Sequence, residues 1–276
     1  MLIKQVIKPY RGRLSLTLLL IIVEALLGIL FPLFIGKAID GIINKQLMYF
    51  WQLAALGLLL IIIGGSRRLF DSRFYAKVYV RLSRVTINKM ESSDNSIKTA
   101  RLNMLAEMVN FAENQLPEII QHSIGLVAVA SIIGFLNFQI FIGALICGLI
   151  VLGLYLLSSK KTLRYNAEFN NELESQVNVI DSKRLSALKL HLLKLMKWNI
   201  RLSDLETINY SGSWIIMLVL LMASIYVSVS GDNIQYGALL ASIMYVYQFI
   251  ERMVSLPLYY QQWLRLYEIT DRIRTV

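Results

Sequence analysis

The chain has 276 residues, of which 56% are hydrophobic, and its mean hydropathy of +0.57 is too high for a soluble domain. The net charge of +10 would suit nucleic-acid binding, but the placement of the basic residues argues against that class. The single cysteine, Cys147, lies in an apolar run, so it forms no disulfide within the chain and indicates no redox compartment. The composition predicts a membrane protein with several spanning helices.

Six apolar segments approach the roughly 20 residues that a helix needs to cross a bilayer. The first is too long for the apolar core of a signal peptide, and no small-residue cleavage site follows it, so we expect it to be retained. Aromatic residues at 49–51 mark one end of the second, as in an interfacial belt, and the sixth is the least apolar. The predicted spans cover residues 14–36, 48–66, 118–138, 139–157, 213–230 and 236–258.

The spacing of these spans predicts two long helical hairpins. Short connections link the spans in pairs, whereas the stretches 67–117 and 158–212 are long and carry apolar residues at three- and four-residue steps. A helix from Met48 to Met90 would be on the order of 65 Å long, about twice the hydrocarbon thickness. Turn-forming Asp and Ser residues place the hairpin tips near 91–96 and 179–187.

The basic residues predict the orientation. Of the 28 Lys and Arg, all but Lys37 and Lys45 lie before the first span, in the two long stretches, or from Arg252 to the C-terminus. By the positive-inside rule, both hairpins and both termini are then cytoplasmic. Topology and contact with membrane lipid therefore explain the positive charge, and we expect no nucleic-acid partner.

Three short segments, together with this layout, resemble the transmembrane domain of ATP-binding cassette (ABC) exporters. "KPYRGRLSLTLLL" is similar to the entry of that family's first helix, and "PLFIGKAIDGII" to its end, through Pro32, Gly36, Ile39 and Asp40. "MVSLPLYYQQWLRLYEITDRI" resembles the sixth helix and its exit, with matching residues Pro257, Arg265, Arg272 and Ile273. The resemblance covers the whole chain. It implies an all-α fold, one membrane domain over 1–276, and a homodimer whose hairpin tips dock on nucleotide-binding domains.

The chain carries no nucleotide-binding motif. Its one Gly-Lys pair, Gly36–Lys37, is followed by Ala38 at a membrane edge, and no Leu-Ser-Gly-Gly-Gln signature occurs. Without a phosphate-cradling loop and its lysine, the chain cannot hydrolyse ATP by that mechanism, so we expect no enzyme activity and no bound cofactor. ATP would act through a separate ATPase subunit. The residues expected to couple to that partner are Asp94, Asn95, Asp181 and Ser182.

The two hairpins depart from the usual exporter pattern. The first lacks the paired phenylalanines that many exporters carry, and the second contains the atypical stretch "HLLKLMKWNIRLSDLETINYS". In this respect the chain looks like the free-standing six-helix domains that occur without a fused ATPase. Three functions stay open: a transporter component driven by a separate ATPase, a scaffold or regulatory dimer, and an ATP-independent, proton-coupled carrier.

Glu24 is the first candidate for the substrate pathway. It lies eleven residues inside a 23-residue span, where a carboxylate costs a few kcal/mol and should therefore face protein or water. It could bind a cation or carry a proton in a cavity. Alternatively, it is hydrogen-bonded to a neighbouring helix and holds the packing.

The sixth span supplies the other pathway candidates. Gln248 and Arg252 are four residues apart and share a helical face, which would line the central pathway of an exporter-like dimer. The alternative is that Glu251 and Arg252 lie at the cytoplasmic interface and extend to water. The full set is Tyr245, Tyr247, Gln248, Glu251 and Arg252. We expect no metal site, because the only two histidines, His122 and His191, are distant in sequence and no cysteine or carboxylate cluster accompanies them.

Overall fold

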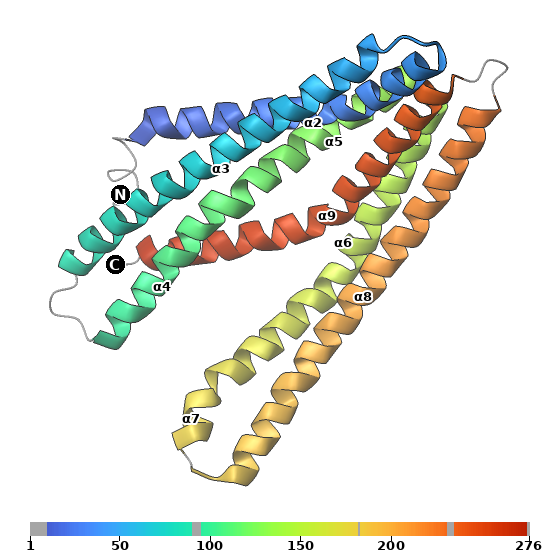
Figure 1. The fold of residues 1–276 in the computed structure, drawn as a ribbon. Coiled ribbons are helices and arrows are strands. Elements are labelled where there is room, and N and C mark those ends of the chain that lie inside the picture. Colours follow the sequence, from blue (N-terminus) through green and yellow to red (C-terminus); the bar gives the residue numbers. More distant parts are fainter. Residues whose placement is uncertain (1–9, 90–94, 182, 231–234, 275–276) are drawn as a thin grey trace. The chain divides into compact units, whose positions relative to one another are not determined.

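A computed structural model describes the chain except for residues 1–9, 90–94, 182, 231–234 and 275–276 (Figure 1). The regular elements of the described residues are helical, so the predicted all-α fold is confirmed. They are α2 (Arg11–Ile43), α3 (Met48–Lys89), α4 (Asn95–Asn110), the π-helical turn η2 (Phe111–Gln115), α5 (Leu116–Leu136), α6 (Phe138–Glu174), α7 (Gln176–Asp181), α8 (Leu185–Val229) and α9 (Tyr236–Arg274).

Five of the described helices are long and apolar enough to cross a membrane. They are α2, α3, the helix running from Arg101 to Leu136, α6 and α8, and they cover the first five predicted spans to within two residues at each end. The sixth predicted span lies in α9. The hydropathy of α9 is below that of the five candidate spans, because Gln248, Glu251 and Arg252 interrupt its most apolar part. The count of six spans therefore stays a prediction.

Helix α3 matches the predicted long helix closely. It begins at Met48 and runs for 42 residues, which is about 63 Å of helix. The tip expected near 91–96 lies mostly outside the described residues: Asp94 is not described, and Asn95 is the first residue of α4. At the second expected tip, Asp181 is exposed at the end of α7, and Ser182 lies outside the described residues.

The chain divides into two compact units, and the first consists of the chain up to Phe138 together with the part from Ile225 onward. Helix α2 packs against α3, α5 and α9 in this unit. Gly36 and Gly237 let α2 and the first turn of α9 approach until their backbones touch. The Gly237 N–H also donates a 2.8 Å hydrogen bond to the Asp40 carboxylate, which satisfies a free amide at the start of α9.

An aromatic and aliphatic core joins α3 to α4 in the same unit. Phe74, Tyr75, Val78, Leu82, Leu105 and Val109 are buried together. Tyr10 and Leu14, at the start of α2, pack on this cluster, and the Tyr10 ring meets Phe74 edge-on at 5.7 Å. The core therefore fixes the beginning of α2 beside the middle of α3.

The second unit spans 139–224 and contains most of α6, with α7 and most of α8. Asn209 donates a 2.8 Å hydrogen bond to the Ser158 hydroxyl, and His191 lies 2.9 Å from Glu172. Asn209 of α8 pairs with Ser158 of α6, and the earlier His191 of α8 pairs with the later Glu172 of α6. The two helices therefore run antiparallel. This agrees with the second predicted hairpin, whose cytoplasmic placement stays a prediction.

The π-helical turn η2 lies directly before Pro117 and links α4 to α5. Proline lacks an N–H and its ring clashes with the carbonyl four residues earlier, so an α-helix cannot pass through it unchanged. The Leu116 N–H instead donates to the carbonyl of Phe111, five residues back. This wider turn takes up one more residue than an α-helical turn and lets the helix continue.

Candidate functional site

Glu24 forms a short ion pair with Arg67 of α3. The Arg67 Nε donates to Glu24 Oε2 at 2.6 Å, and the two side chains are 7% and 19% exposed. Gly64, one turn before Arg67, makes room for the carboxylate, because a Cβ there would lie 2.9 Å from Glu24 Oε1. Glu24 therefore faces protein, one of the two environments that the sequence allowed, and its contact is with a cation on the neighbouring helix.

Asp71 and Thr17 extend this pair into a network of four side chains. Arg67 Nη1 donates to Asp71 Oδ2 at 3.0 Å, and the Thr17 hydroxyl donates to Asp71 Oδ1 at 2.7 Å. Asp71 is only 1% exposed, so its charge depends on these two donors. One guanidinium thus holds two carboxylates between α2 and α3.

Arg67 and Asp71 were not among the residues predicted from the sequence, although the chain contains a signal for Arg67. The connection 44–47 joins α2 to α3, and Glu24 and Arg67 each lie 20 residues from its nearer end. Two antiparallel helices joined by a tight turn place such residues at the same level. An acidic residue inside one span therefore pointed to a cation at the matching position of the next.

A polar cavity of about 370 Å³ adjoins the network, between α3 and the start of α5. Arg67 and Asp71 form part of its wall, and Glu113, Glu118 and Gln121 contribute from the other side. The side-chain nitrogen of Gln121 is buried without a hydrogen-bond partner, so it is free to donate to a guest molecule or to water. This cavity can accept a polar group beside the charged network.

The structure separates the predicted residues of α9 into two kinds. Tyr245 is 1% exposed and its hydroxyl donates to the Ile29 carbonyl of α2 at 3.0 Å, so in this unit it holds α9 against α2. Tyr247 is half exposed and Glu251 is exposed. The prediction that these residues line a substrate pathway remains untested.

Gln248 and Arg252 share a face of α9, as their spacing predicted. Arg252 Nη1 lies 3.0 Å from the Gln248 carbonyl and 3.1 Å from its side-chain oxygen. The guanidinium rests on the backbone of Gly125 in α5, where no side chain larger than hydrogen would fit. Its Nε is buried without a partner, and so is His122 Nδ1 on the same helix as Gly125. The α5–α9 contact therefore contains polar groups that the described protein atoms do not satisfy.

The two histidines lie in different environments. His122 packs its ring against Tyr259 at 4.9 Å in the first unit, and His191 contacts Glu172 in the second. Within the described part of the chain, no group of three or more His, Cys, Asp or Glu could hold a metal ion. The absence of a metal site from the whole chain stays a prediction.

Comparison with known proteins agrees with the fold. A solved structure described as a bacterial Atm1-family ABC exporter with ATP bound matches with a TM-score of 0.66 and 14% sequence identity. The match covers 96% of this chain, which spans 54% of the exporter chain's length. No curated protein matches the sequence. The fold is that of an ABC exporter transmembrane region, in a multi-pass membrane protein.

The family follows from the sequence itself. The family model for the ABC transporter transmembrane region matches residues 3–237, which is most of the chain. The chain therefore belongs to the ABC transporter transmembrane region family, as the resemblance of its spans and hairpins to ABC exporters had predicted.

Proposed function

We propose that this chain is the membrane-spanning component of an ABC-type transporter in a bacterial inner membrane, working as a homodimer with a separate ATPase subunit. The family match over residues 3–237 carries the proposal. Residues 1–276 contain neither the phosphate-binding loop nor the signature motif of the ATPase, and the proposal assigns ATP hydrolysis to a partner. Membrane lipid surrounds the spans, both termini face the cytoplasm, and no cofactor binds this chain.

The proposed mechanism is alternating access. Closure of the ATPase pair would move the tips around Asp94–Asn95 and Asp181–Ser182, and the long helices would carry that movement into the membrane. Helix α3 is suited to this role, because it is continuous for 42 residues and is fixed to α2 by the Glu24–Arg67–Asp71 network. The polar cavity beside Arg67 supports a pathway for a polar substrate.

The ion pair bears on the proton-coupled alternative. Glu24, the only carboxylate of the first predicted span, is held by a 2.6 Å bond from the Arg67 guanidinium. A proton-coupled carrier would have to break this pair in each cycle. The ATPase-driven transporter needs no such step, and we therefore rank it first.

Co-purification tests the proposal. Tagged protein extracted from its native membrane is expected to retain an ABC ATPase subunit in fixed stoichiometry and to hydrolyse ATP. Asp181→Lys is expected to abolish both, whereas Glu206→Lys, which reverses an exposed acidic residue of α8 away from the tip, is expected to preserve both. A homodimer that carries no ATPase under any extraction condition would overturn the proposal and favour the scaffold.

A further inference from the structure

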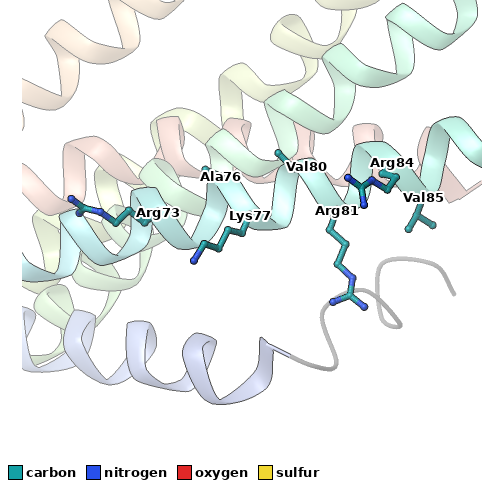
Figure 2. Close-up of a pocket in the computed structure, with 7 residues that line it drawn as sticks. All are labelled: Arg73, Ala76, Lys77, Val80, Arg81, Arg84 and Val85. Carbon is teal, nitrogen blue, oxygen red and sulfur yellow. The ribbon is translucent and has the colours of Figure 1, made fainter.

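One exposed face of α3 concentrates positive charge near the expected cytoplasmic surface of the membrane. Arg73, Lys77, Arg81 and Arg84 lie three or four residues apart, so they project from one side of the helix (Figure 2). They line an open groove together with the apolar side chains of Ala76, Val80 and Val85. The opposite side of α3 is buried in the core around Phe74 and Leu82. We call the seven groove residues the basic face of α3.

Among the described residues, no acidic side chain forms an ion pair with the cations of this face. Arg73 donates to the Leu69 carbonyl on its own helix at 2.9 Å, and Arg81 stacks over the Tyr10 ring at 5.6 Å. Lys77 and Arg84 are exposed and form no ion pair with a described residue. Four guanidinium and ammonium groups thus lie within about 17 Å of helix and face solvent or a ligand.

The neighbouring helix places this face at the membrane boundary. The predicted first span begins at Leu14, and Leu14 packs on the cluster that contains Phe74. The predicted second span ends at Ser66, so the two helices together put the inner edge of the hydrocarbon between the levels of Ser66 and Phe74. Tyr10 lies just beyond that edge, where aromatic rings are common, and contacts Arg81. The basic face therefore begins at this edge and continues into the headgroup layer and beyond.

We infer that the basic face of α3 binds the headgroup of an anionic phospholipid in the cytoplasmic leaflet. Charge favours this occupant, because four cations without an acidic partner among the described residues share one helical face, and they match a phosphate and its neighbouring anionic lipids. Depth favours it as well, since the face starts where headgroups lie. Small side chains at 76 and 80 leave the groove shallow enough for a headgroup to reach the flanking arginines. The bound lipid would fix the depth of α3 and of the attached α2.

A charge-matched pair of triple variants tests this inference. Arg73→Gln/Lys77→Gln/Arg84→Gln removes three cations and leaves Arg81 on Tyr10, where it contributes to packing. Lys189→Gln/Lys194→Gln/Lys197→Gln removes the same charge from exposed positions on α8, at least 16 residues before the predicted fifth span. Native mass spectrometry of each detergent-extracted protein, titrated with phosphatidylglycerol or phosphatidylcholine, would measure lipid affinity and stoichiometry.

We expect saturable binding of phosphatidylglycerol to the unaltered protein and the α8 variant, with little binding of phosphatidylcholine. Each cation near an anionic surface contributes about a fivefold gain in affinity, so the α3 variant should bind about a hundredfold more weakly. Added salt should also weaken the binding of phosphatidylglycerol to the unaltered protein, because it screens the attraction between the cations and the headgroup. This salt titration keeps the test informative even where the triple variant is not recovered as a folded protein.

Three results would overturn the inference. The α3 variant could bind phosphatidylglycerol as tightly as the α8 variant, which would show that the lipid binds through the overall positive charge and not at this face. Glycerol 3-phosphate could compete as strongly as the lipid, which would indicate a soluble phosphate ligand. The α3 variant could keep its lipid but lose a co-purifying ATPase subunit, and the face would then be a protein interface.

Discussion

Loss of the guanidinium at the centre of the α2–α3 network should destabilise the protein far more than loss of the Glu24 carboxylate. Arg67→Gln leaves Glu24 and Asp71 without their shared cation, and Asp71 is 1% exposed. Removing one partner of a buried ion pair typically costs about 3–5 kcal/mol, because the remaining charge stays buried and unpaired. Glu24→Gln instead leaves the Arg67–Asp71 pair neutral and intact, so we expect a cost of about 1 kcal/mol or less.

Thermal unfolding in detergent would measure this difference. At about 2–4 °C per kcal/mol for a chain of this size, Arg67→Gln should lower the melting temperature by about 6–20 °C. Arg68→Gln is the matched control, because it removes the same charge from an exposed neighbour on the same helix and should shift melting by less than about 2 °C.

Two outcomes would refute the reasoning about this network. One is an Arg67→Gln variant that has the same melting temperature as Arg68→Gln. The other is a triple variant, Arg67→Gln/Glu24→Gln/Asp71→Asn, that is no more stable than Arg67→Gln alone. The triple variant removes both stranded charges, so the account requires it to recover most of the loss.

Further predictions concern the contacts of α9 and the second hairpin. Gly237→Ala should lower stability by about 1–3 kcal/mol, because the new Cβ would fall on the α2 backbone. Gly28→Ala is the control, because open space surrounds Gly28 on α2, and its melting temperature in thermal unfolding should stay unchanged. Tyr245→Phe should cost about 0.5–1.5 kcal/mol through the lost bond to the Ile29 carbonyl, and an unchanged melting temperature would contradict that bond. Asn209→Ala should loosen the second unit, which hydrogen exchange of the α8 amides would detect as faster exchange; equal rates would count against that contact.

Helices and their ends were largely predictable, because apolar runs and turn residues act locally. Met48 begins α3, and the break at Asn137 separates α5 from α6, both as the sequence indicated. The exception is α9, where Gln248 and Arg252 make the apolar signal too weak to establish a span by composition. A polar helix that packs on others needs tertiary context before it can be assigned.

Partners were harder to predict than helices. The sequence identified Glu24 as a residue that needs compensation, but the compensating Arg67 is 43 positions away and depends on the register of two helices. The hydrogen bond from Tyr245 to the Ile29 carbonyl of α2 was not predicted either, because a contact with a backbone carbonyl leaves no trace in side-chain patterns. The resemblance to exporters was more informative at Gly36 and Asp40, which form the contact between α2 and the start of α9.

The most direct test of the transporter account is an ATP-dependent distance change between the hairpin tips of two protomers. A Cys147→Ser/Lys189→Cys variant carries a single spin label at an exposed position near the start of α8, so any dipolar signal reports the distance between protomers. With the ATPase subunit present, a non-hydrolysable ATP analogue should shorten that distance and its removal should restore it. An identical distance distribution with and without nucleotide would contradict the account and indicate a static dimer.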